Sequence, residues 1–217
     1  MSFYSPWAFN PTYFIFIGPA LLLGIWAQSR LKGTFARYAR VATSSGVNGQ
    51  TAAQILMRQE RLHIGVRATN GVLTDFYNPA DKTINLSQTS GQNSIASVAV
   101  VAHELGHAVQ DQQGYSPMRL RAAIVPPLRA SAWIGPIMLL AGLYMSSPPL
   151  IWTGILTFVL AAVFALVTLP VEYNASSRGL AMLQTSGILS ASEMPAAKAV
   201  LDAAALTYVA AAAQAIL

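Results

Sequence analysis

Long uncharged runs of apolar residues constrain this chain more than any other feature of its sequence. Residues 1–29, 131–145, 150–170 and 203–217 contain no charged side chain. A helix needs about 20 mainly apolar residues to cross the hydrocarbon core of a bilayer, and the second run reaches this length when it is extended back across Arg129 to residue 126. The composition agrees, since 54% of the 217 residues are hydrophobic and only 10% are charged. We therefore expect a mainly α-helical integral membrane protein with about four transmembrane helices.

The apolar runs predict an order of segments along the chain. Residues 1–29 are expected to form an N-terminal transmembrane helix, because the apolar core at residues 13–28 is not preceded by the basic residues that a cleaved signal peptide would carry. Residues 126–170 are expected to form a transmembrane hairpin that turns at 146–149, where two serines precede two prolines. Residues 171–217 then hold a further helix and a C-terminal transmembrane helix. Residues 30–125 form one portion outside the bilayer.

The basic residues indicate which side of the membrane that portion occupies. Of the 13 Lys and Arg residues, all but Arg178 and Lys198 lie between the first span and the end of the segment that leads into the hairpin. The positive-inside rule places such a segment in the cytoplasm. The net charge of +5 does not indicate nucleic acid, because the basic residues flank apolar segments and are not interleaved with aromatic residues on a polar face.

The sequence His-Glu-Leu-Gly-His at residues 103–107 carries the clearest chemical signal. His103 and His107 are four residues apart, so on a helix they lie one turn apart on the same face. Neutral imidazoles at this spacing can bind one zinc ion together, and Glu104 can take a proton from zinc-bound water. The chain has no cysteine, which excludes thiolate zinc sites and cysteine nucleophiles. We expect a helix that ends near Gln113 and one zinc ion as the cofactor.

Glu172 is the third ligand that we expect for this zinc ion. A catalytic zinc takes three protein ligands and keeps an open fourth position, and two histidines with one glutamate are a known set. Glu172 follows the predicted hairpin, so two membrane crossings return it to the side that holds His103 and His107. An unpaired carboxylate directly after an apolar span would be costly. The alternative is a solvated charge at the membrane boundary.

Between residues 62 and 86 the apolar residues recur with a period of two, which is typical of short strands. Asn70-Gly71 and residues 78–81 supply turns, so two or three strands precede the motif helix. A small sheet can bind an extended peptide along an open edge, and we place Asn85 on that edge as one of two choices. His63, the third histidine, could be a metal ligand or an oxyanion donor. A lone histidine at the start of a strand is more often a surface or core residue.

Several blocks, in order along most of the chain, form a more specific pattern than the zinc motif alone. They are Asn85–Ser87, Ser94–Ala96, Ala102–Gln110, Thr168–Ser176 and Leu201–Ala210. In these blocks the chain resembles the YugP-like zinc membrane metallopeptidases of bacteria. The resemblance implies a zinc-dependent endopeptidase-like enzyme of the bacterial cell (inner) membrane, with a zincin-like α+β catalytic portion. It implies peptide or membrane-protein substrates and leaves their identity open.

The block around Glu172 also resembles, more distantly, the integral-membrane gluzincins that include the CAAX prenyl proteases and heat-shock membrane peptidases. Those proteins carry Glu-x-x-Ala-Asp, in which the glutamate binds zinc and the aspartate supports a zinc-binding histidine. Glu172 and Ala175 match this pattern, whereas Ser176 stands where the aspartate would be. A serine hydroxyl can orient an imidazole more weakly than a carboxylate, and Asn174 is a second candidate for that role.

The pattern predicts hydrolysis of a peptide bond by a zinc-activated water with Glu104 as general base. Arg178 is the expected donor to the oxyanion, with a membrane-flanking arginine as the alternative reading. One alternative function is that of an intramembrane metalloprotease. It predicts an apolar run of span length around the motif, whereas here the apolar stretch has only about fifteen residues and is flanked by polar ones. Another rival is a non-catalytic scaffold held by zinc. A purely structural site needs no general base, and its fourth position is usually closed.

Overall fold

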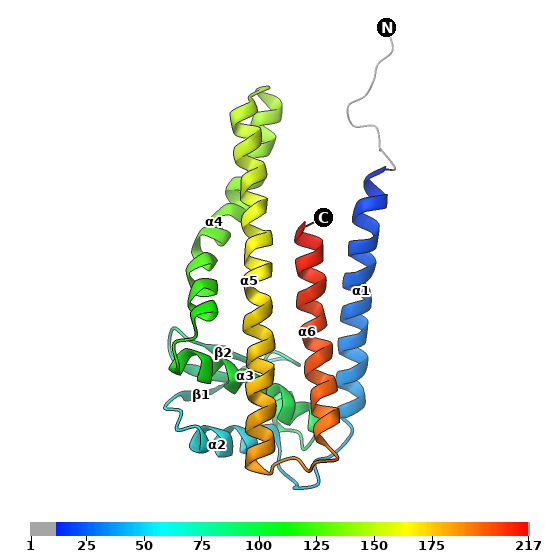
Figure 1. The fold of residues 1–217 in the computed structure, drawn as a ribbon, viewed down its shortest axis with the longest axis vertical. Helices are drawn as coiled ribbons and strands as arrows, with labels where there is room; N and C mark the ends of the chain where they lie inside the picture. The colour runs from blue at the N-terminus through cyan, green and yellow to red at the C-terminus, as the bar shows by residue number, and fades with distance from the viewer. Residues whose placement is uncertain (1–11, 217) are drawn as a thin grey trace.

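The structure, a computed structural model, describes residues 12–216. The first part of the predicted N-terminal span, residues 1–11, lies outside the described residues. Helix α1 (Thr12–Tyr38) runs beside α6 (Met194–Ile216), and α4 (Ser116–Tyr144) and α5 (Pro148–Ser186) form the expected hairpin. Helix α3 (Ile95–Gln112) lies across the lower end of this arrangement (Figure 1). The mainly helical prediction is confirmed.

Three helices of the described chain, α4, α5 and α6, are long and apolar enough to cross a membrane. Helix α5 has 39 residues and continues without a break past Pro170. At 1.5 Å per residue, it is about 58 Å long, whereas a bilayer core is only about 30 Å thick. The two ends of α5 therefore meet different surroundings, and Figure 1 shows the hairpin extending beyond the end of α6.

A three-stranded sheet lies beside α3, as the period-two pattern predicts. Strands β1 (Gly65–Ala68) and β2 (Phe76–Asn78) flank β3 (Thr83–Leu86), with β1 parallel and β2 antiparallel to it. The placement of Asn85 on an edge strand is wrong, because β3 is the central strand and all four of its residues are buried. The polar side chains in β3 are accommodated locally: the Asn85 amide donates to Thr83 Oγ1 (3.4 Å), which donates to Asp81 (2.6 Å).

Helix α3 forms the centre of the core. Its start is capped by Ser94, whose hydroxyl accepts the Ser97 N–H at 3.2 Å. Most of its residues are buried, and α2 (Gly49–Gln59), α5 and α6 pack against it. The short η1 helix (Gln88–Gly91) connects it to the sheet. The hydrophobic core therefore surrounds the helix that carries the zinc motif.

Two glycines allow α3 and α5 to cross in close contact. A Cβ on Gly106 would lie 2.3 Å from the Ala175 carbonyl oxygen, and one on Gly179 would lie 2.8 Å from the Ala102 carbonyl oxygen. Each contact is with backbone, which cannot rotate away as a side chain can. The glycine inside the His-Glu-Leu-Gly-His motif thus has a packing role: it lets α5 approach the turn of α3 that carries both histidines.

Candidate metal centre

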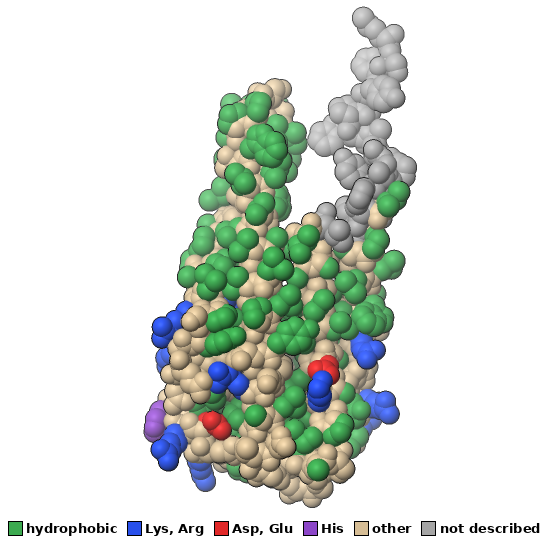
Figure 2. Space-filling model, in the orientation of Figure 1, with side chains coloured by type: hydrophobic (Ala, Val, Ile, Leu, Met, Phe, Trp, Pro, Cys, Tyr) green, Lys and Arg blue, Asp and Glu red, His purple; other side chains and the backbone are tan. Residues whose placement is uncertain are grey.

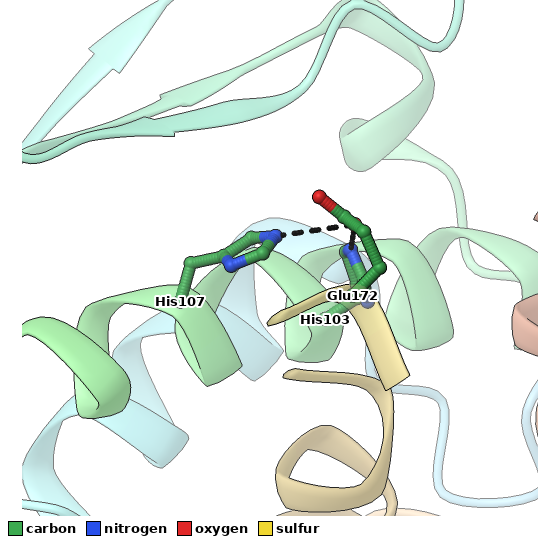
Figure 3. A group of neighbouring side chains, drawn as sticks. All are labelled: His103, His107 and Glu172. Carbon is green, nitrogen blue, oxygen red and sulfur yellow. Dashed lines mark hydrogen bonds and ion pairs between the residues drawn. The ribbon is translucent and has the colours of Figure 1, made fainter. Parts of the chain in front are cut away.

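His103, His107 and Glu172 meet where α3 and α5 cross. Both imidazoles project from α3 toward the Glu172 carboxylate, which comes from α5 (Figure 3). The distance from Glu172 Oε2 is 3.2 Å to His103 Nε2 and 3.5 Å to His107 Nε2. Glu172 is 2% exposed. The structure therefore brings together the three residues predicted as ligands and buries the carboxylate among them.

The geometry of this group fits a zinc ion. The three ligand atoms all lie within 4.8 Å of one another. In a tetrahedral site with zinc–ligand bonds of 2.0–2.2 Å, two ligand atoms are separated by about 3.3–3.5 Å, and the two nitrogen–oxygen distances are close to this value. Two imidazoles and one carboxylate are also the donor types that catalytic zinc prefers. His103, His107 and Glu172 would hold the ion.

Each histidine is supported through its other ring nitrogen. His103 Nδ1 lies 3.0 Å from Ser176 Oγ, so the serine that replaces the gluzincin aspartate does contact the histidine. His107 Nδ1 lies 3.0 Å from the side-chain oxygen of Gln110, a fully buried residue. Such contacts fix the orientation of a metal-binding ring. The sequence pointed to Ser176 but not to Gln110.

Glu104 lies beside the ligands and faces the sheet. Its Oε2 accepts the backbone N–H of Tyr77, on β2, at 3.0 Å. Burial raises the pKa of the Glu104 carboxyl, although the two neighbouring histidines oppose this shift. Burial alone would lower the pKa of His107, but the Glu172 and Glu104 carboxylates reverse the direction and raise it. A carboxylate with raised proton affinity beside a metal site suits a general base.

A pocket of about 450 Å³ opens onto this group. Glu104, His107 and Glu172 line it together with β2 and one face of α4. Arg121 on α4 enters the pocket, and its Nη1 donates to Glu172 Oε1 at 2.8 Å. Tyr208 on α6 also lines the pocket. The space beside the ligands is therefore accessible and carries an arginine and a tyrosine that the sequence did not indicate.

Two other residues considered from the sequence lie elsewhere. Arg178 donates to Asn174 Oδ1 (2.7 Å) and Gln113 Oε1 (2.6 Å), and lines a different pocket from Glu104. It follows Glu172 by six residues, which is about 240° around a helix at 3.6 residues per turn. His63 is exposed and lines a third pocket. The structure thus does not bring Arg178 to the predicted oxyanion position, and it leaves His63 outside the ligand group.

Helical spacing could have identified part of this surrounding layer. Gln110 follows His107 by three residues, so the two share a face of α3. Ser176 follows Glu172 by four residues, so these two share a face of α5. Arg121 and Tyr208 come from two other helices, α4 and α6, so no spacing within one helix relates them to the ligands. Only the packing of α4 and α6 places them at the pocket, and no local pattern marks them.

Comparison with known proteins agrees with this geometry. Residues 13–217 match a family model described as "Putative neutral zinc metallopeptidase". The chain is also 40% identical over 202 residues to a Bacillus subtilis (strain 168) protein named "Putative membrane protease YugP", covering 92% of this chain and 90% of that protein. No solved structure matches the chain. The match over nearly the whole length shows that this chain belongs to the neutral zinc metallopeptidase family that includes YugP.

Proposed function

We propose that this chain is a zinc-dependent endopeptidase, embedded in the bacterial cell membrane by several helices, with its site on the cytoplasmic side. One observation carries the proposal: two members of the ligand group, His107 and Glu172, line an open pocket together with Glu104. A zinc ion held by two histidines and a glutamate supplies an acidified water and polarises a carbonyl group. The residues around it have separate tasks.

Glu104 takes the proton of the attacking water and passes it to the leaving amine. Burial raises the pKa of this carboxyl, which favours its action as a proton acceptor. Arg121 and Tyr208 line the same pocket as Glu104 and replace Arg178 as candidates for the donor that stabilises the oxyanion. Arg121 also holds Glu172 Oε1, which leaves Oε2 directed toward the two histidines.

The substrate binds, in this proposal, as an extended strand along β2. Strand β2 is an edge strand whose Tyr77 N–H points away from β3. This N–H donates to Glu104, so an added strand would have to take the donor over from that carboxylate. Strand addition uses backbone hydrogen bonds, so it accepts varied sequences as long as they are unfolded. Tyr77→Pro removes this donor, whereas Tyr77→Phe removes only the hydroxyl that bonds Asp111 (2.7 Å). We expect a higher KM for Tyr77→Pro than for Tyr77→Phe at equal zinc content; equal KM values in folded protein would exclude this binding mode.

The distribution of side chains supports the membrane placement. Figure 2 shows hydrophobic side chains over the hairpin and charged ones at the end that holds α2, α3 and the sheet. The basic residues that the positive-inside rule assigns to the cytoplasm lie at this charged end. Helix α3 is not among the candidate spans found in the described residues, which favours a site below the membrane surface over an intramembrane protease. Peptides or membrane-protein segments at the cytoplasmic surface are therefore the expected substrates.

The replacement Glu104→Gln tests whether the site is catalytic or only a scaffold. The amide cannot accept a proton, so we expect unchanged zinc content and cleavage of an unfolded casein-like substrate reduced by about 10²–10⁴-fold. Glu60→Gln, at the end of α2, is the matched control and should cleave like the wild type. Near wild-type cleavage by Glu104→Gln would mean that Glu104 is not the general base.

A further inference from the structure

A chain of four polar side chains connects Arg178, at the edge of the α3–α5 contact, to the ligand His107. It runs from Arg178 to Asn174 on α5, then to Gln110 and His107 on α3. We propose that this chain fixes which nitrogen of His107 faces the metal, with Gln110 as the positioning residue and with the Val171 carbonyl oxygen and the Asn174–Arg178 pair together setting the orientation of its amide. The inference rests on the zinc site proposed above and assigns roles within it.

The first step fixes the Asn174 amide. A guanidinium group has only donors, and Arg178 Nε lies 2.7 Å from the Asn174 side chain. The Asn174 atom facing it must therefore be the carbonyl oxygen, since an amide nitrogen there would place two donors against each other. Gln113 Oε1 accepts from the same guanidinium at 2.6 Å and holds it in place.

The second step fixes the Gln110 amide. One end of this buried group lies 2.9 Å from Asn174 Oδ1 and 2.8 Å from the Val171 carbonyl oxygen. Both partners only accept, so this end must be the NH₂ group, and its two hydrogens satisfy both of them. The Gln110 oxygen is consequently at the other end, 3.0 Å from His107 Nδ1.

The third step fixes the histidine. An amide oxygen carries no proton, so His107 Nδ1 must donate. A neutral imidazole has one N–H, and the lone pair therefore resides on Nε2, the atom that lies 3.5 Å from Glu172 Oε2. Zinc binding needs this tautomer. His103 differs: its Nδ1 faces the Ser176 hydroxyl, which can donate or accept, so that contact selects no tautomer.

The two histidines can be compared directly by nuclear magnetic resonance, because the chain has only three histidines and the third, His63, is exposed. In zinc-loaded, ¹⁵N-histidine-labelled protein we expect the His107 Nδ1–H to exchange slowly with water. Gln110→Met should speed this exchange at least about tenfold without changing His103, and should weaken zinc binding by about 10–100-fold. Ser176→Ala should change only the His103 signal and leave the exchange rate of the His107 Nδ1–H as in the wild type.

Arg178 supplies a second test that leaves the buried amide intact. Arg178→Lys keeps a group that only donates, so it should preserve both the His107 Nδ1–H signal and the zinc affinity, whereas Arg178→Met should have a smaller effect than Gln110→Met, because the Val171 carbonyl oxygen still accepts from Gln110. Wild-type exchange rates and zinc affinity in Gln110→Met would overturn the inference. A wild-type protein that binds no zinc would instead overturn the proposed function, and the His107 signal of the metal-free protein would still report on the chain of contacts.

Discussion

The two halves of α5 have the same helical backbone but opposite surroundings. Toward the hairpin turn, large apolar side chains face outward, and Leu156 is 64% exposed. Beyond Pro170, Leu183 is fully buried and Glu172 meets the two histidines. One continuous helix therefore carries both an exposed apolar half that is long enough to cross a membrane and the candidate third ligand. It places the candidate metal centre within about one turn of the end of the apolar run, which in the proposed function would bring cleavage close to the membrane surface.

Replacing the same residue type in each half tests this contrast most strongly. Leu183→Ala leaves a cavity in the core and should lower the free energy of unfolding by about 3–5 kcal/mol. Leu156→Ala should change it by no more than about 0.5 kcal/mol, because lipid tails are as apolar as the side chain that they replace. Unfolding in lipid bicelles measures both values. Equal losses would mean that the upper half of α5 is packed against protein and not against lipid.

A smaller effect is expected from the α3–α5 crossing. Gly106→Ala forces a methyl group against the Ala175 carbonyl oxygen, which cannot move away, and should cost about 1–3 kcal/mol and weaken zinc binding as the helices separate. Gly33→Ala, on α1, is the matched control because nothing lies within 4 Å of its added Cβ. That change should stabilise the helix by up to about 1 kcal/mol. Unchanged zinc affinity in Gly106→Ala would argue against a tight crossing.

Local patterns predicted the parts of the site that depend on spacing within one segment. The i, i+4 histidines, Glu104 and the hairpin that returns Glu172 follow from helical period and span length. The contact of Ser176 with His103 was expected from the resemblance to the gluzincins, whose supporting aspartate stands at this position. The helical period also explains why Arg178 points to another side of α5, and this argument was available from the sequence.

What could not be predicted depends on packing between distant segments. Arg121 reaches Glu172 only because α4 folds back along α5. The strand order places β3 in the middle, although its alternating polar residues resemble an edge strand, because Thr83 and Asn85 are satisfied within the sheet. Pro170 removes one backbone donor and is a common end of a helix, yet the packing of α5 against α3 and α6 carries the helix through it.

The zinc content of purified protein tests the central claim most directly. Elemental analysis should find one zinc ion per chain in the wild type and almost none in Glu172→Ala, as in His103→Ala. Asp202→Ala is the matched control, since it removes an exposed carboxylate that pairs with Lys198 at 2.6 Å, and it should keep its zinc. Full zinc occupancy in Glu172→Ala would contradict the assignment of α5 as the carrier of the third ligand.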